Sequence, residues 1–179
     1  MTWQIDPAHT QIQFSVRHMM IANVRGRFER FEGIVDFDED NPANTTIDFR
    51  IETGSIYTHN ADRDAHLRSA DFFDAENYPH MTFKSRRVEL MDDNHARLIG
   101  DLTIRDVTRE VRLDVEYVGQ AQSPWGTISA GFNLDAAINR KSWGLEWNQA
   151  LETGGFLVGD NVNIAIEVEL VKQPQEAAV

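Results

Sequence analysis

Segments of strand length, in which apolar side chains recur at every second position, dominate the chain. In the first segment this face comprises Ile12, Phe14, Val16 and His18. In the last it comprises Val162, Ile164, Ile166, Val168 and Leu170. Because successive side chains of a β-strand point to opposite faces, each segment has one apolar and one polar face. A chain built from such segments must pack its apolar faces together in a sandwich or a barrel.

Eight such segments follow one another, separated by turn sequences. They cover residues 10–20, 24–38, 46–56, 81–90, 95–104, 109–119, 125–139 and 162–171. Two stretches break the alternation, and short helices are predicted there, at residues 60–73 and 145–153. About eight strands is the size at which a closed barrel can hold one small ligand. The pattern therefore predicts an all-β, eight-stranded antiparallel barrel that forms a single domain over residues 1–171, followed by a loose tail over 172–179.

The second segment is unusually long and carries glycines in its interior. Gly26 and Gly33 lie within it, and its aromatic residues Phe28 and Phe31 are three positions apart rather than two. Glycine inside a strand often marks a bulge or a sharp bend. We therefore expect the sheet to curl in this region.

Composition and charge exclude several classes of function. The net charge of −12 argues against a nucleic-acid partner, because phosphate binding needs a basic surface. The chain has no cysteine, so disulfides, thiolate nucleophiles and cysteine-ligated zinc do not arise. It shows neither a secretory signal at its first residues nor a run of about 20 apolar residues long enough to span a membrane. We therefore expect a cytoplasmic protein, or a periplasmic one if a leader has been removed.

The inward faces carry more large apolar side chains than a tight eight-stranded core needs, which favours an enclosed ligand cavity. The residues predicted to contact a ligand are Phe14, Val16, His18, Phe49, Ile51, Met81, Phe83, Leu98, Leu102, Leu113, Phe132, Leu134 and Arg140. His18 is either a hydrogen-bonded core histidine or a polar group near the cavity mouth that contacts a ligand head. Arg140, with Lys141, either belongs to a solvent-facing turn or binds a head-group anion.

Metal and cofactor chemistry is not indicated. No two histidines have the close spacing that metal sites usually show; they are His9, His18, His59, His66, His80 and His95. The carboxylates are scattered along polar strand faces, and nothing singles out a catalytic acid–base pair. The sequence therefore predicts no metal, no cofactor and no catalytic residues.

Several local sequences, taken in order, resemble one family over nearly the whole chain. They are residues 3–10 (WQIDPAHT), 14–18 (FSVRH), 24–28 (VRGRF), 62–74 (DRDAHLRSADFFD), 78–79 (YP), Phe83, 100–104 (GDLTI), 138–140 (INR), 143–144 (WG) and 158–160 (VGD). Each is weak alone, but the ordered set is similar to the YceI-like, polyisoprenoid-binding family. The chain departs from it at Thr10, where relatives often have serine, and begins directly at the first motif, where many relatives carry an export signal.

This resemblance implies a lipocalin-like, eight-stranded barrel that holds a long lipid chain in an apolar tunnel without established catalysis. A polyisoprenoid or quinone tail is the first candidate, and fatty acids or amides are compatible with the family. The implied activity is therefore binding and sequestration or transport of such a lipid.

Two other functions remain open from the sequence. A filled barrel could serve as a protein-interaction module, in which case no pocket above roughly 300 Å³ is expected. Alternatively, an enzyme acting on isoprenoid lipids could use His18 as a base and Arg140 as an anion clamp, although no carboxylate that would orient His18 is evident. A homodimer is compatible with all three.

Overall fold

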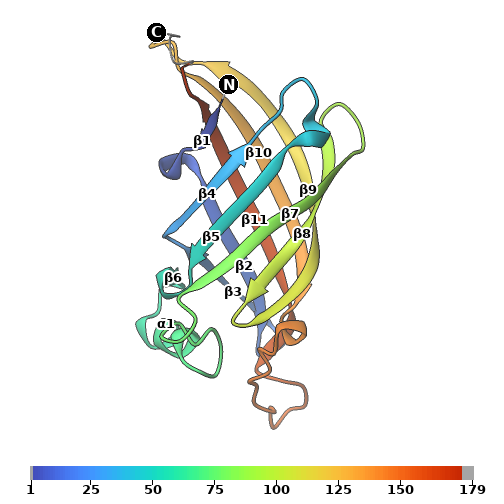
Figure 1. The fold of residues 1–179 in the computed structure, drawn as a ribbon. Coiled ribbons are helices and arrows are strands. Elements are labelled where there is room, and N and C mark those ends of the chain that lie inside the picture. Colours follow the sequence, from blue (N-terminus) through green and yellow to red (C-terminus); the bar gives the residue numbers. More distant parts are fainter. Residues whose placement is uncertain (1, 175–179) are drawn as a thin grey trace.

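The computed structural model describes residues 2–174, which form an elongated antiparallel β-barrel with one α-helix in the described range (Figure 1). The strands are β1 (Trp3–Ile5), β2 (Gln11–His18), β3 (Ala22–Phe28), β4 (Phe31–Asp36), β5 (Thr46–Glu52), β6 (Ile56–Tyr57), β7 (His80–Leu90), β8 (His95–Ile104), β9 (Val107–Gln122), β10 (Ile128–Asn139) and β11 (Val158–Lys172). Helix α1 spans Ala61–Arg68, and short 3-10 turns are η1 (Pro7–His9), η2 (Pro42–Asn44), η3 (Thr53–Ser55) and η4 (Arg140–Trp143).

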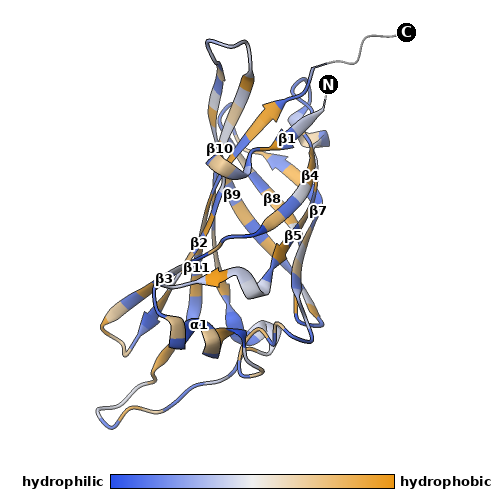
Figure 2. Ribbon diagram, turned by 90° about the vertical axis from the view of Figure 1, so that its left-hand side faces the viewer, coloured by the Kyte–Doolittle hydropathy of each residue, from blue (hydrophilic) through white to orange (hydrophobic). Residues whose placement is uncertain are grey.

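The eleven strand segments form eight walls of a closed barrel, as predicted. β1 closes it by pairing with both β4 and β11. β1 and β2 lie one after the other along β11, and β3 and β4 together form the next wall. β5 and β6 form the wall beside that one, since β5 pairs with β4 and β6 with β3. From β7 to β11 each strand pairs with its neighbour in sequence. Figure 2 shows apolar and polar residues alternating along the strands.

The long second segment is interrupted between its two glycines. β3 ends at Phe28 and β4 begins at Phe31, so the break falls at Glu29 and Arg30. The Arg30 N–H donates to Ser55 Oγ at 3.0 Å, and the Arg30 carbonyl accepts from Glu52 N–H at 3.0 Å. At this bend, hydrogen bonds to a side chain and to loop residues thus replace the regular hydrogen bonds between strands. The shift in apolar spacing indicated such a bend.

One of the two predicted helices is present and the other is not. The Asn60 side chain accepts from Arg63 N–H at 3.0 Å and caps α1, which ends at Arg68 rather than reaching residue 73. The helix predicted at 145–153 is wrong. That segment is irregular, with a bridge between Ala150 and Phe156.

The end of the chain continues the sheet further than the predicted domain boundary. β11 extends to Lys172, which pairs with Trp3. The Gln173 N–H then donates to the Thr2 carbonyl at 2.8 Å. The remainder of the predicted tail, residues 175–179, lies outside the described residues.

The two ends of the barrel differ in what covers them (Figure 1). At one end lie Thr2 and Gln173, near the limits of the described residues, with η2 and the turns β7–β8 and β9–β10; we call this the termini end. At the other lie α1, the β2–β3 turn and residues 144–157; we call this the helix end. The cavity of the barrel lies between these two ends.

Candidate functional site

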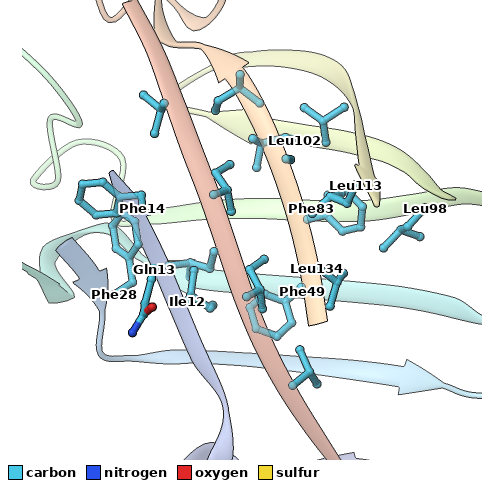
Figure 3. Close-up of a pocket in the computed structure, with 18 of the residues that line it drawn as sticks. Ile12, Gln13, Phe14, Phe28, Phe49, Phe83, Leu98, Leu102, Leu113 and Leu134 are labelled. Atoms are coloured by element: carbon cyan, nitrogen blue, oxygen red, sulfur yellow. The ribbon is translucent and has the colours of Figure 1, made fainter. Parts of the chain in front are cut away.

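The barrel encloses a cavity of about 1120 Å³ that runs from the termini end to the helix end. Inward side chains from every wall line it. Apart from Gln13, the lining residues labelled in Figure 3 expose only carbon atoms. A volume of this size contradicts the filled-barrel alternative. The middle of the cavity can therefore accept an apolar group but offers few hydrogen-bonding partners.

All of the residues predicted to contact a ligand lie in the lining of this one cavity. They are Phe14, Val16 and His18 on β2, Phe49 and Ile51 on β5, Met81 and Phe83 on β7, Leu98 and Leu102 on β8, Leu113 on β9, Phe132 and Leu134 on β10, and Arg140 in η4. Alternation along the strands places all of them inward except Arg140, which lies in η4. Their contact with a ligand stays a prediction.

Glycines opposite phenylalanines keep the cavity wide. Gly26 pairs directly with Phe14 and Gly33 with Phe49. A Cβ added at either glycine would lie only 2.4 Å from the phenylalanine ring. Each ring therefore occupies the space that a side chain would fill on the neighbouring strand, and lies against the wall instead of projecting across the barrel.

The termini end of the cavity is acidic. Glu39 lies there and accepts from Lys172 Nζ at 2.8 Å and from Gln120 Nε2 at 2.8 Å. The hydrogen bond from Lys172, followed by that from Gln120, lowers the pKa of Glu39. Asp92 and Asp93 line the same end. The hydrogen bond from the Asn94 N–H, followed by that from His95, lowers the pKa of Asp92. These carboxylates therefore present negative charge to the cavity.

The helix end is covered by contacts between the α1 region and residues 145–149. The His66 ring lies 4.5 Å from Trp147 and 5.1 Å from Phe72, measured between ring centroids. All three rings line the cavity. His66 Nε2 also lies 2.9 Å from Asp71 Oδ2, so its ring is held from both sides. This aromatic group joins two segments that are distant in sequence and covers part of the opening.

His18 and Arg17 mark the helix end of the wall formed by β2. Both line the cavity. The His18 ring has no hydrogen-bond partner among residues 2–174, so the structure does not support the hydrogen-bonded core histidine. No carboxylate within the same range lies within hydrogen-bonding distance of its ring nitrogens, so no group orients it as a base.

Arg140 is neither a solvent-facing residue nor a free anion clamp. It is buried, and Nε donates to the Gly159 carbonyl at 2.8 Å. Nη1 donates to the carbonyls of Leu145 at 2.5 Å and Trp147 at 3.0 Å, and Nη2 to Val158 at 3.3 Å. Burial lowers its pKa, and Asp160 opposes that effect. Because most of its donors serve backbone carbonyls, Arg140 holds residues 145–147 against the start of β11.

Sequence reasoning missed the lining residues that lie outside the regular strands. They include Leu67 in α1, Phe72 and Phe73 after it, and Leu145 and Trp147 before β11. The paired aromatics at positions 72 and 73 were a signal, because a solvent-exposed loop rarely needs two. Their placement depends on tertiary contacts that strand periodicity does not encode.

A cluster of potential metal ligands lies on the outer surface, away from the cavity. Asp6, His9 and Glu169 have ligand atoms within 4.8 Å of one another. Asp6 and His9 already pair at 2.8 Å, and the hydrogen bond from Asp6, followed by the charge of Glu169, raises the pKa of His9. Mutual pairing explains this cluster, and the prediction that no metal is bound stays a prediction.

Among the described residues, no helix is both long and apolar enough to cross a bilayer.

The sequence comparisons identify one family over nearly the whole chain. The profile of the YceI-like domain matches residues 3–170. A UPF0312 protein of Staphylococcus epidermidis is 38% identical over 168 residues, covering 93% of this chain and 95% of that protein. A UPF0312 protein of Staphylococcus aureus is 34% identical over 165 residues, covering 92% and 94%.

Solved structures with the same fold agree with this assignment. The Campylobacter jejuni YCEI protein has a TM-score of 0.76 at 33% identity, with 88% of this chain and 90% of that chain covered. Burkholderia cenocepacia BcnA has a TM-score of 0.80 at 23% identity, covering 93% and 99%. A polyisoprenoid binding domain from Saccharophagus degradans has a TM-score of 0.68 at 13% identity, covering 96% and 99%. The protein is thus a member of the YceI-like family.

Proposed function

We propose that this protein binds a long-chain apolar lipid inside the barrel, for sequestration or transport, without changing it chemically. The observation that carries the proposal is the continuous apolar cavity of about 1120 Å³. A water molecule occupies ~30 Å³ in the liquid. If each carbon atom with its hydrogens needs the same volume, the cavity holds on the order of thirty to forty carbons. That capacity fits a polyisoprenoid or quinone tail and exceeds what a single ordinary fatty acid would fill.

The affinity expected for such a ligand is high. At about 0.3 kcal/mol per heavy atom, a tail of about forty carbons could contribute ~12 kcal/mol, which corresponds to nanomolar binding. The gain comes from removing apolar surface from water. We therefore expect the lipid to remain bound during purification.

The charges at the two cavity ends suggest which way the lipid lies. Glu39, Asp92 and Asp93 would repel an anionic head group at the termini end. At the helix end the lining offers the cations of Arg17 and Arg63 and the imidazole of His18, against the carboxylate of Asp62. The proposed orientation therefore places the tail toward the termini end and the head group near His18.

The Saccharophagus neighbour, described as a polyisoprenoid binding domain, supports the choice of lipid class. The free side chain of His18 supports binding rather than catalysis, because a general base needs a partner that orients it. His66 and His95 in the lining do contact carboxylates, but among the described residues no hydroxyl group hydrogen-bonds to a histidine.

Two neighbouring positions on β10 provide a matched test. Leu134 lines the cavity, whereas Asp135 is exposed on the outer face of the same strand. We expect the wild type, once its bound lipid has been extracted, to bind a fluorescent prenyl probe at one per chain. Leu134→Trp should weaken that binding at least about tenfold by filling the tunnel, while Asp135→Trp should leave it unchanged. Equal binding by both variants, with both folded, would refute the proposal.

A further inference from the structure

An exposed apolar surface lies at the helix end, where two loops meet. We call it the apolar tip; it consists of Met19, Met20 and Ile21 in the β2–β3 turn and Phe156 in the neighbouring loop. Ile21 is 81% exposed and Phe156 is 55% exposed. The two loops are held together, because Met19 N–H donates to the Leu157 carbonyl at 2.8 Å. Met20 also packs against Gly155, where an added Cβ would lie 3.1 Å from Met20 Cγ.

The backbone of the β2–β3 turn disfavours the residues that occupy it. Met19 has φ 52° and Met20 has φ 66°, and the Ile21 N–H donates to the His18 carbonyl at 3.2 Å. Positive φ at both central positions is the arrangement of a type I′ turn, which strongly prefers Asn-Gly. Two methionines there carry a conformational cost that asparagine and glycine would avoid. Folding therefore does not explain their presence, and exposed side chains in strained backbone point to a contact.

The hairpin that carries the apolar tip is basic, although the chain as a whole is strongly acidic. Residues 7–28 contain Arg17, Arg25 and Arg27 and neither aspartate nor glutamate, in a chain whose net charge is −12. The opposite end of the barrel carries the acidic residues described above. Arg17 and Arg25 therefore lie next to the apolar tip, although the helix end also carries the acidic residues Asp62, Glu146 and Glu152.

The apolar tip adjoins the mouth of the cavity on both of its loops. His18, next to Met19, lines the cavity, as do Leu157 and Val158, next to Phe156. Figure 2 shows the β2–β3 turn at the same end of the barrel as α1. A surface contacted by the tip would thus lie beside the end at which a lipid head group is proposed to sit.

We propose that the helix end docks on an anionic lipid bilayer, with the apolar tip inserted between head groups and Arg17 and Arg25 facing their phosphates. Apolar side chains gain by leaving water, and cations near an anionic surface gain by attraction. Docking in this orientation presents the cavity mouth to the membrane and keeps Glu39, Asp92 and Asp93 away from it. The use of such docking, delivery or uptake of a lipid, rests on the proposed function. The docking itself does not, since the exposed surface is present whatever the cavity holds.

Flotation of the full chain with vesicles tests the proposal. Vesicles of phosphatidylcholine with about 30 mol% phosphatidylglycerol are compared with phosphatidylcholine alone. We expect the wild type to float with the anionic vesicles and to be released by salt. The variant M19N/M20G/I21S should lose at least about tenfold in vesicle binding, while its preferred turn residues preserve or raise its Tm. Trp125→Ser removes an 89% exposed aromatic in the β9–β10 turn, at the termini end, and should float like the wild type.

The contribution of the arginines is tested with the double variant R17Q/R25Q. It should bind anionic vesicles more weakly than the wild type, and its binding should depend less on salt. The proposal is overturned if the wild type fails to float with anionic vesicles, as a protein partner for the tip would predict, or if M19N/M20G/I21S floats equally well.

Uptake of the prenyl probe from solution by protein freed of its bound lipid separates this proposal from the function of the cavity. The tip variant should still take up the probe, whereas Leu134→Trp should lose uptake and still float. Flotation by a wild type that takes up no probe would leave docking standing and remove the proposed function.

Discussion

At the scale of single residues, the width of the cavity depends on glycines, which leave room for the ring on the neighbouring strand. Phe49 lies against Gly33 and Phe14 against Gly26, so large inward rings coexist with an empty barrel centre. The sequence indicated that both glycines were unusual within a strand. It did not indicate why, because the facing residue depends on the pairing register between two strands, which the alternation within one strand does not give.

Gly33→Ala should narrow the cavity and destabilise the fold. The new methyl would lie 2.4 Å from Phe49 Cδ2 and 3.0 Å from the Asp48 carbonyl oxygen, so the ring must move inward. We expect a loss of about 1–3 kcal/mol in the free energy of unfolding and weaker binding of long prenyl chains than of short ones. Urea denaturation measures the free energy of unfolding. Competition between long and short prenyl chains for the cavity measures the change in binding. Gly54→Ala, where the added Cβ meets nothing within 4 Å, is the control.

Arg140 shows a limit of sequence reasoning at this scale. Two cations after an apolar strand indicate a surface turn, yet η4 directs the first of them into the protein, where backbone carbonyls receive its donors. Arg140→Lys keeps the charge but offers a single nitrogen. We expect it to lower the free energy of unfolding by about 2 kcal/mol, measured in urea. Lys141→Arg, at an exposed neighbour, should change little, and equal effects at both positions would contradict this role.

Glu39 should make stability depend on acid. Its pKa is lowered in the folded protein, mainly by the hydrogen bond from Lys172, so the stabilisation is present above the ordinary glutamate pKa. It is lost as the pH falls through the lowered value. When thermal unfolding is followed between about pH 6 and pH 3, the Tm of the wild type should therefore fall more steeply than the Tm of Glu39→Gln. Parallel curves would show that the contact does not persist in solution.

At the scale of elements, strand alternation predicted the walls of the barrel but not their interruptions. The segments 81–90 and 95–104 correspond closely to β7 and β8. The segment 46–56 is divided by η3, and β1 is too short to show a period. The false helix at 145–153 follows from the same limitation. Its residues suit a helix locally, but the carbonyls of Leu145 and Trp147 accept from Arg140 instead of from helical N–H groups.

Trp147 should control how fast the lipid leaves. It contacts His66 and Phe72 and so joins residues 145–149 to the α1 region. Trp147→Ala should loosen this cover and speed transfer of a bound prenyl probe to acceptor vesicles by at least about threefold, because opening needs fewer contacts to break. Stopped-flow fluorescence measures the rate. Trp125→Ala at the termini end should leave it unchanged, and an unaltered rate in Trp147→Ala would place the exit elsewhere.

At the scale of the whole molecule, the two ends of the cavity differ in the charges that line them. One end is acidic, and the other carries the basic hairpin with the apolar tip. The alternating pattern was enough to predict that the barrel is closed, and the ordered motifs were enough to predict the family. The difference in charge was visible only once the fold had placed Glu39 and Asp92 at one end and Arg17 at the other.

The central claim is that the cavity holds a long apolar lipid, and mass spectrometry of an organic extract tests it most directly. Purified wild type and Leu134→Trp are extracted in parallel after identical handling. The account predicts about one prenyl or other long-chain lipid per wild-type chain, as nanomolar affinity implies, and little in the variant. An extract of the folded wild type without stoichiometric lipid, or an equal yield from the variant, would contradict it.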